Sequence, residues 1–508
     1  GHIERINLAE KDFEGLNNGI YTIYSDTGTG KSECIMSTLY SVAKAQGEKI
    51  LLFSNRVAVK GQQAIGIQGK EDTIDLVTYQ KIEYRKKGSE DFLVLLGYGD
   101  CFKRAEVYIS TFKYIVCDEA HYFVSDTDFN SYTDTLIEVI KKIKQNHIVI
   151  MATATSECLQ PYLEEVLGKN EIIPLYQGTV DYSRIDKAYW YDQIYNSLDY
   201  LPENDPVLDI IDSIPQNEKI VCFMSSKDRM KKLCCWYNEK RLGGAVYISS
   251  DEKNTKQFKN ILEICKFEEH ILISTKVVDN GVNLIDKNIK HIILEQPDWI
   301  EFKQCLGRRR FDYLDEADKV TLYFSNMRKT ISIKTAELSK ALDVYNEFLN
   351  CKIEIDGHIL FDKENFWYKY RRKALPKFIE NGTGKVIEPI LFKTQYDYEF
   401  YSQFKKENNK QFQDFIAEKT GLKVKHWYSP TLIERMETFL KNNCEKKFYG
   451  ETEKSFIAHV LGLSERAQPK TINSYLNDLG VPYVIRNERD TTRADRKRYW
   501  IIKKNVDK

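Results

Sequence analysis

The sequence lacks the features that would place the protein in a membrane, outside the cell or around a metal ion. No apolar run approaches the roughly 20 residues that a membrane-spanning helix needs. Residues 1–5 show no basic stretch followed by an apolar one, so we expect no secretion signal and a cytoplasmic protein without a membrane partner. The 11 cysteines include no C-x-x-C pair, which argues against a zinc site and a disulfide framework. We therefore expect reduced, mostly buried thiols.

The chain also lacks net charge, with 75 basic and 75 acidic residues, but the two signs are unevenly distributed. Residues 351–508 contain 31 Lys and Arg against 22 Asp and Glu, whereas residues 1–350 contain 44 against 53. A polyanionic partner is therefore expected at the C-terminal end. The length of 508 residues suggests about three domains.

A glycine-rich stretch follows the first apolar strand pattern. The strand pattern covers residues 20–24, residues 25–32 read SDTGTGKS, and apolar residues at helical spacing continue to Gly47. Strand, glycine loop and helix start in this order are the context of a phosphate-binding P-loop, whose backbone N–H groups and helix dipole bind phosphates. Ser25 stands where the pattern has its first glycine, and the loop alone could be an ordinary tight turn.

This loop supplies candidate ligands for a nucleotide and a metal ion. Lys31 would reach the β- and γ-phosphates of ATP, and the hydroxyl of Ser32 would ligate Mg²⁺. The candidate nucleotide-binding residues of the loop are Gly28, Thr29, Gly30, Lys31 and Ser32.

A second motif, Asp-Glu-Ala-His at residues 118–121, follows a strand pattern at residues 114–117. Two adjacent acids at the end of a buried strand are costly to desolvate unless a cation lies nearby. In a P-loop enzyme, Asp118 would hold Mg²⁺ and Glu119 would take a proton from the attacking water. An acidic helix N-cap is the alternative for this tetrapeptide taken alone.

Together, the two motifs resemble those of DEAH-type helicases of superfamily two. Residues 152–155 (ATAT) resemble the motif that links hydrolysis to domain movement, and Thr275, Gly281 and Asn283 have the spacing of the fifth motif. Residues 304–311 resemble the sixth motif, Gln-x-x-Gly-Arg-x-x-Arg. The resemblance implies an α/β fold with two tandem RecA-like P-loop domains, in which helices flank parallel sheets, and it implies ATP and Mg²⁺ as cofactors.

The resemblance also implies roles for further residues. Gln304 and the arginines of the sixth motif would act at the γ-phosphate. An aromatic residue stands where the last arginine is usual, so Arg308 and Arg310 are assigned, and Arg309 competes for the role of arginine finger. Gly281 would join the nucleotide site. The residues expected at the nucleic-acid backbone are Arg56, Thr78, Ser225 and Thr275.

The last stretch predicts a winged helix-turn-helix. Helix patterns cover residues 431–443, 453–461 and 469–479, and strand patterns at 481–485 and 498–502 flank a polar tip. The third helix would lie in a major groove of DNA and the hairpin would form a basic wing, although winged helices also dock proteins. This end is similar to C-terminal modules of phage, plasmid and large-virus replication helicases. The expected DNA contacts are Lys470, Arg493, Arg496, Lys497 and Arg498.

These patterns predict a DNA helicase or translocase that depends on ATP and acts in the replication of a phage or other mobile element. Its partners would be DNA, as a single strand in the motor and as a duplex at the winged helix, and other replication proteins. The alternatives are an ATP-switched DNA-binding protein with little unwinding and an RNA remodelling helicase. The expected segments are a RecA-like ATP-binding domain (1–180), a proline-containing linker (181–218), a second RecA-like domain (219–345), an aromatic and basic connection (346–425) and the winged helix (426–508).

Overall fold

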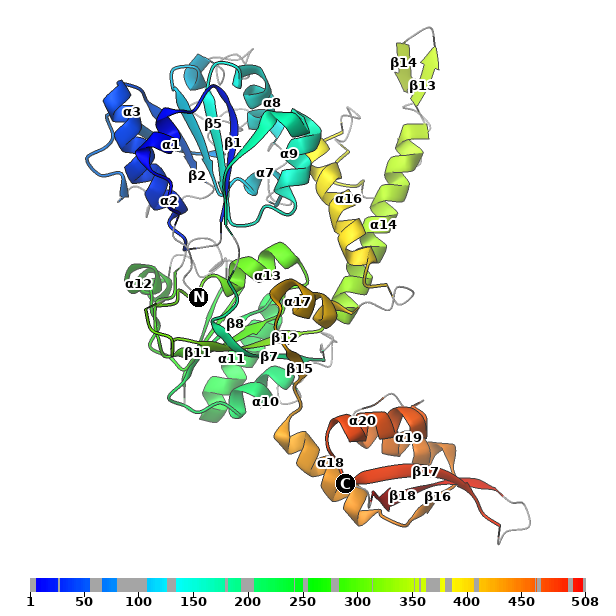
Figure 1. Cartoon of the computed structure of the whole chain (residues 1–508). Coiled ribbons are helices and arrows are strands. Elements are labelled where there is room, and N and C mark those ends of the chain that lie inside the picture. Colours follow the sequence, from blue (N-terminus) through cyan, green and yellow to red (C-terminus); the bar gives the residue numbers. More distant parts are fainter. Residues whose placement is uncertain are drawn as a thin grey trace. The chain divides into compact units, whose positions relative to one another are not determined.

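The computed structural model divides into two compact units, one of residues 1–195 and 217–424 and the other of residues 196–216 and 425–508 (Figure 1). The residues that the structure describes are 6–25, 28–54, 66–79, 107–125, 134–178, 181–192, 205–241, 243–249, 255–275, 283–312, 314–350, 352–355, 358–361, 375–379, 386–405, 411–461, 463, 467–491 and 497–505.

The first unit contains two β-sheets, and the first sheet has the strand order β3-β2-β4-β5-β1-β6. All its neighbouring strands pair in parallel. We call this sheet and its helices lobe 1 (residues 6–178). Its strands are β1 (Gly19–Tyr24), β2 (Ile50–Ser54), β3 (Ile74–Thr78), β4 (Tyr114–Asp118), β5 (Ile148–Thr153) and β6 (Ile172–Gln177).

Helices cover both faces of this sheet. Successive residues of a strand point to opposite faces, and in β4 Ile115 and Cys117 pack with one set of helices, whereas Tyr114 and Val116 pack with the other. A strand buried on both faces appears in the sequence as a continuous apolar run, which is why the sequence predicts β1 and β4. One face carries α7 (Tyr122–Ser125), α8 (Asp134–Ile143) and α9 (Leu159–Leu167), and the other carries α1 (Glu10–Glu14), α2 (Lys31–Cys34), η1 (Ile35–Leu39) and α3 (Tyr40–Gln46).

The second sheet has the strand order β15-β7-β12-β11-β8-β10-β9. The described pairs from β7 to β9 are all parallel. We call the strands β7 to β12 of this sheet and their helices lobe 2 (residues 185–192 and 219–325), and the two lobes are consistent with tandem RecA-like domains. The strands are β7 (Ile185–Tyr191), β8 (Lys219–Phe223), β9 (Ala245–Ile248), β10 (Ile271–Ser274), β11 (Ile289–Leu294), β12 (Val320–Ser325) and β15 (Val424–His426), and the helices are α11 (Lys227–Arg241), α12 (Lys256–Ile264) and α13 (Trp299–Leu306).

The segment predicted as a linker, residues 181–218, contains regular structure. Residues 185–191 form β7, which pairs with β12 inside the sheet of lobe 2. Residues 206–212 form α10 (Pro206–Asp212), whose first helical position is the proline itself and whose N-cap is Asp205. Residues 185–191 of the predicted linker therefore belong to the sheet of lobe 2, and residues 206–212 are helical.

A helical segment follows lobe 2. It contains α14 (Arg328–Asn350), a hairpin of β13 (Lys352–Ile355) and β14 (His358–Phe361), α16 (Glu388–Ser402) and α17 (Phe412–Thr420). Helix α14 lies beside α16 (Figure 1). The expected aromatic and basic connection, residues 346–425, therefore contains regular structure. Within the described residues, no helix has the length and apolar character needed to span a bilayer.

The second unit has its own core. It contains α18 (Pro430–Asn442), α19 (Glu451–Val460) and α20 (Pro469–Asp478), and an antiparallel sheet of order β16-β18-β17 with β16 (Lys447–Phe448), β17 (Tyr483–Arg489) and β18 (Arg498–Lys504). Met436, Ile457 and Ile472, one from each helix, pack with Ile485 and Trp500 of the sheet. The predicted helices and hairpin are thus present, and β17 extends four residues beyond its predicted end near the tip, whereas β18 extends two residues beyond its predicted end near the C-terminus.

Candidate active site

The glycine loop lies at the carboxyl end of β1 and leads directly into α2. Gly28 and Gly30 have φ angles of +88° and +92°, which side chains with a Cβ rarely adopt. Lys31 is 7% exposed, and its Nζ donates a hydrogen bond to the carbonyl oxygen of Ser25 at 2.6 Å. The hydroxyl of Ser25 donates to Thr29 Oγ1 at 2.8 Å. The residue that departs from the P-loop pattern therefore helps to hold the loop closed around the lysine.

The carboxylate of Asp118 faces the helix that follows this loop. Ser32 Oγ donates to Asp118 Oδ2 at 2.9 Å, although the two residues lie 86 positions apart. Burial and the negative charge of Glu119 raise the pKa of Asp118 to about 6, while Ser32 and Lys31 oppose the shift. A hydroxyl beside a carboxylate suits Mg²⁺, which binds through hard oxygen atoms and commonly takes only one or two protein carboxylates.

Glu119 has a left-handed backbone, with φ of +52°. This conformation costs a residue other than glycine about 1 kcal/mol or more, so the turn after β4 is strained. Burial raises the pKa of Glu119, but His121, Lys31 and Arg308 outweigh it and lower that pKa to about 2. The cationic neighbours of Glu119 therefore keep its carboxylate ionised.

Residues of lobe 2 meet this acidic pair. Gln304 Nε2 donates to His121 Nε2 at 3.1 Å, and the positive charge of Arg308 is near enough to lower the pKa of Glu119. Arg310 lies against the glycine loop, because a Cβ built on Gly28 would be only 2.8 Å from Arg310 Nη1. The structure therefore brings the predicted residues of both lobes to one place.

Arg309, the alternative candidate for the arginine finger, points toward Asp318 of its own lobe. Its guanidinium forms an ion pair with Asp318, and both side chains are almost fully buried. The ring of Phe311 lies 5.0 Å from the same guanidinium. Arg310 instead donates from Nε to Asn283 Oδ1 at 2.8 Å and faces the loop of lobe 1. The geometry thus favours Arg310 over Arg309 at the nucleotide site.

The residues predicted at the nucleic-acid backbone are described only in part. Thr78 ends β3 and is half-buried, Ser225 follows β8 and is exposed, and Thr275 follows β10 and is 7% exposed. Ser225 and Thr275 lie at the carboxyl edge of the parallel sheet in lobe 2, where ligands of such sheets bind. Arg56 and Gly281 lie outside the described residues.

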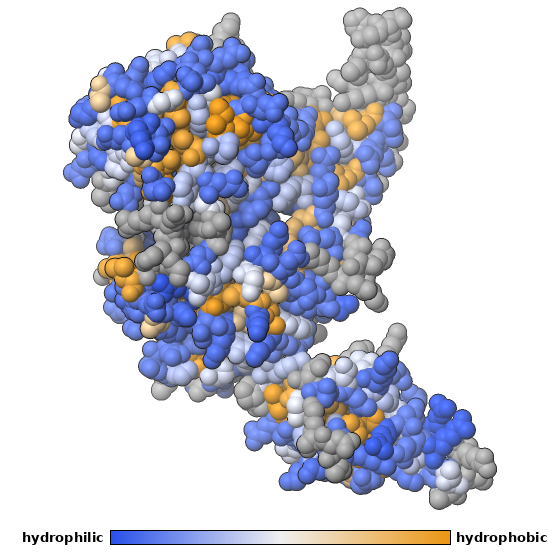
Figure 2. Space-filling view, viewed as in Figure 1, coloured by the Kyte–Doolittle hydropathy of each residue, from blue (hydrophilic) through white to orange (hydrophobic). Residues whose placement is uncertain are grey.

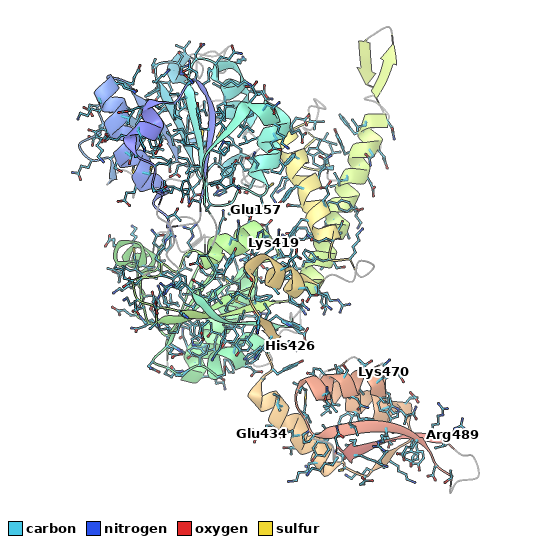
Figure 3. All side chains as sticks on the ribbon, in the orientation of Figure 1. Glu157, Lys419, His426, Glu434, Lys470 and Arg489 are labelled. Carbon is cyan, nitrogen blue, oxygen red and sulfur yellow. The ribbon has the colours of Figure 1, made fainter. Side chains whose placement is uncertain are left out.

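The sequence motifs do not indicate several residues around the site. Glu157 Oε1 accepts a hydrogen bond from Trp299 Nε1 at 3.2 Å and also pairs with Lys303, so lobe 1 contacts α13 at a second point (Figure 3). The buried hydroxyl of Tyr79 donates to the carbonyl oxygen of Asp118 at 2.8 Å and fixes the end of β4. The only sequence signal that points to Glu157 is its position just after the ATAT motif.

In the second unit, the predicted basic residues that the structure describes are exposed. Lys470 lies in the first turn of α20, and Lys497 and Arg498 lie where β18 begins. Figure 3 places Lys470 on α20 and Arg489 at the end of β17. Figure 2 shows a mainly hydrophilic surface over the visible end of this hairpin. Arg493 and Arg496 lie outside the described residues.

Two sequence families match this chain in tandem. Residues 3–158 match the family described as type III restriction enzyme, res subunit, and residues 203–312 match the helicase conserved C-terminal domain. A search of curated proteins returned no match.

Solved structures of similar fold include RNA-bound and restriction-type proteins. S. cerevisiae Dbp5 bound to RNA and ADP BeF3 shares 14% identity with a TM-score of 0.41, over 61% of this chain and 79% of that one. Mss116p bound to ssRNA and AMP-PNP shares 13% with a TM-score of 0.45, over 76% and 84%. A fragment of a putative HsdR subunit of a type I restriction enzyme from Vibrio vulnificus YJ016 shares 15% with a TM-score of 0.39, over 61% and 60%. These likenesses are too distant to indicate a substrate. The two family matches, in this order along one chain, support a superfamily 2 helicase with NTP-dependent activity.

Proposed function

We propose that the protein is an ATP- and Mg²⁺-dependent helicase or translocase that acts on DNA. The observation that supports this most strongly is the convergence of residues from the two lobes. Lys31 and Asp118 come from lobe 1, and Arg310 from lobe 2 lies against the loop that carries Lys31. A triphosphate held between such residues would link ATP binding to closure of the lobes, and hydrolysis would release them.

Each residue would have a separate task. Lys31 and the N–H groups of the loop would bind the phosphates. Ser32 and Asp118 would hold Mg²⁺, which supplies positive charge to the phosphate oxygens when it is bound. Glu119, kept ionised by its cationic neighbours, would orient the attacking water. Arg308 and Arg310 would stabilise the negative charge that develops at the γ-phosphate.

We propose further that the second unit is a winged helix that binds duplex DNA. Three helices followed by a β-hairpin agree with that arrangement, and α20 presents exposed Lys470, Thr471 and Ser474. The hairpin adds exposed Arg486, Arg489, Lys497 and Arg498, which suit contacts to phosphates. Replication of a phage or other mobile element, together with other replication proteins, is the role that we propose for the whole chain.

The ATPase rate of the full chain, with and without DNA, tests the proposal. We expect DNA to stimulate hydrolysis, and we expect Glu119→Gln to lose most of the stimulated rate while it still binds an ATP analogue. A Glu119→Gln variant that hydrolyses ATP at the full rate would exclude Glu119 from the reaction.

A strand-displacement assay separates a motor from an ATP-switched DNA-binding protein. Stimulated hydrolysis without displacement of a partial duplex would favour the switch. Competition between DNA and RNA for stimulation of hydrolysis distinguishes a DNA enzyme from an RNA remodelling enzyme, and we expect DNA to compete more strongly.

A further inference from the structure

Helix α16 belongs to neither β-sheet but packs against the cores of both lobes. Near its start, the ring of Phe392 lies 5.2 Å from that of Tyr162 on α9, and Tyr396 also packs against the core of lobe 1. Near its end, Tyr401 is 1% exposed and belongs to the core of lobe 2. A single helix of 15 residues therefore contacts both halves of the candidate active site.

A largely buried lysine lies in the middle of this helix. Lys393 Nζ contacts both carboxylate oxygens of Asp397, one turn further along α16, and lies 3.4 Å from Asp298 Oδ2 of lobe 2. The side chains of Lys393 and Asp298 are each 13% exposed. Burial disfavours the charge on Lys393, but Asp397 and Asp298 outweigh burial and hold the pKa of Lys393 well above its usual value. The lysine is therefore a cation between two carboxylates.

Asp298 uses its two oxygen atoms for different tasks. Its Oδ1 accepts from the backbone N–H groups of Ile300 and Glu301, at 2.8 and 3.0 Å, and so caps the first turn of α13. Its Oδ2 is the atom that faces Lys393. The lysine of α16 thereby fixes the capping residue of α13, and with it the position at which α13 begins.

Helix α13 leads to the arginines of the candidate site. Lys303 pairs with Glu157 of lobe 1, and Gln304 donates to His121 one residue later. The helix ends at Gly307, so Arg308 and Arg310 follow immediately. A displacement of the start of α13 would therefore be carried along a rigid element of only eight residues to the residues that face Glu119 and Gly28.

We propose that Lys393 is a positioning residue for ATP hydrolysis, which acts through Asp298 and α13 to hold Arg308 and Arg310 at the nucleotide. This inference rests on the proposed function, because it assumes that these two arginines act on the γ-phosphate. It adds a part of the chain that contains no helicase motif to the machinery of hydrolysis. A change in how the two lobes pack against α16 would therefore change the positions of the two arginines.

The test is the substitution Lys393→Met, which keeps the length of the side chain and removes its charge. Misplacement of catalytic groups by about 1 Å can cost about 100-fold in rate, so we expect kcat for ATP to fall by about 10-fold or more. The Kd of an ATP analogue should change little, because the residues expected to bind its phosphates lie in lobe 1. Lys405→Met is the matched control, since Lys405 is an exposed lysine just beyond α16, and we expect it to keep the wild-type rate.

A double-mutant cycle with Arg308→Ala distinguishes positioning from a loss of folded protein. If Lys393 acts through the arginines, Lys393→Met should reduce the rate of the Arg308→Ala enzyme by less than about 2-fold, because residues that act as a unit are not additive. If Lys393→Met multiplies its full effect onto Arg308→Ala, or leaves kcat unchanged, the inference is overturned. If Arg308→Ala alone keeps the full rate, it is the proposed function that fails.

Asp298→Asn tests the same contact if Lys393→Met does not fold. Asparagine caps a helix as well as aspartate does, so this variant keeps the cap and removes the charge that faces Lys393. We expect a loss of kcat of the same order, with the melting temperature measured alongside to correct for unfolded protein. A folded Asp298→Asn protein with wild-type kcat would contradict the proposed role of Lys393.

Discussion

Three adjacent arginines of lobe 2 differ in what they contact because of the backbone that carries them. Leu284 N donates to the carbonyl oxygen of Arg308, and Arg310 N donates to the carbonyl oxygen of Leu284, so residues 308–310 run as a short extended bridge. In extended backbone, alternate side chains point to opposite sides. Arg308 and Arg310 therefore face lobe 1, whereas Arg309 points into lobe 2 toward Asp318.

Alanine substitutions should distinguish the arginine that faces lobe 1 from the arginine that points into lobe 2. Arg310→Ala should lower kcat by at least about 100-fold with little change in melting temperature, because it removes a charge aimed at the transition state. Arg309→Ala should destabilise the protein by about 3 kcal/mol, since it leaves the buried carboxylate of Asp318 without its main partner. Thermal melting and ATPase rates of both variants test this contrast. Equal losses of rate per folded molecule would contradict it.

At the scale of elements, the sequence predicts strands that are buried along their whole length better than strands that are partly exposed. Strands β4 and β5 are buried along their whole length, and such strands are visible as apolar runs. Strand β7 is buried at Ile185, Ala188 and Tyr191, with more exposed residues between them. That spacing matches neither the alternation of a half-buried strand nor a continuous run, so the segment is indistinguishable from a linker in the sequence.

Helix α20 shows that the sequence also fails to predict which single side chains are exposed. The polar residues near its start suit contact with DNA, but only Lys470, Thr471 and Ser474 among them are exposed. Asn473 instead bonds to the backbone of Ile485, donating to its carbonyl oxygen at 2.8 Å and accepting from its N–H at 2.7 Å. Helical spacing indicates which face a residue occupies, but it cannot indicate which face the hairpin covers.

We expect Asn473→Ala to destabilise the second unit without a specific effect on DNA contacts. The substitution removes two hydrogen bonds and leaves the backbone groups of Ile485 unsatisfied, which costs about 2 kcal/mol in total. Urea denaturation monitored through Trp500, which lies in the core of this unit, measures the loss. A variant with unchanged stability and weakened DNA binding would assign Asn473 to the DNA interface instead.

Lys470→Ala should weaken the binding of DNA with little effect on stability. Its exposed ammonium group contributes little to stability, and the loss of one phosphate contact should lower the slope of log K against log salt by about 1. Duplex binding at several salt concentrations measures that slope. Lys441→Ala provides the control, because Lys441 is an exposed lysine in the last turn of α18, which contributes no residue to the proposed contact surface. An unchanged slope for Lys470→Ala would exclude this lysine from the phosphates.

At the scale of the whole molecule, the order of motifs predicts which residues converge, but not what holds them together. Ser32 and Asp118 meet as the family pattern implies, and Gln304 reaches His121 across the lobes. The contacts of Glu157 and Lys393 belong to none of the motifs named above, because they depend on how α13 and α16 pack. Sequence patterns therefore predict the reacting groups better than the residues that hold those groups in place.

The division into two compact units leads to a last prediction, on thermal unfolding. The apolar clusters of the first unit share no residue with the cluster of the second, so calorimetry of the full chain should show separate transitions for the two units. An ATP analogue with Mg²⁺ at about 100 times its Kd should stabilise one of them by about 2.7 kcal/mol and leave the other unchanged, because ligand binding stabilises only the unit that holds the site. Lys31→Ala should abolish the shift, whereas Arg310→Ala should keep most of it, since the residues expected to bind the phosphates lie in lobe 1. Two transitions that shift together would show that both units bind the nucleotide or unfold as one, and would contradict a site confined to the first unit.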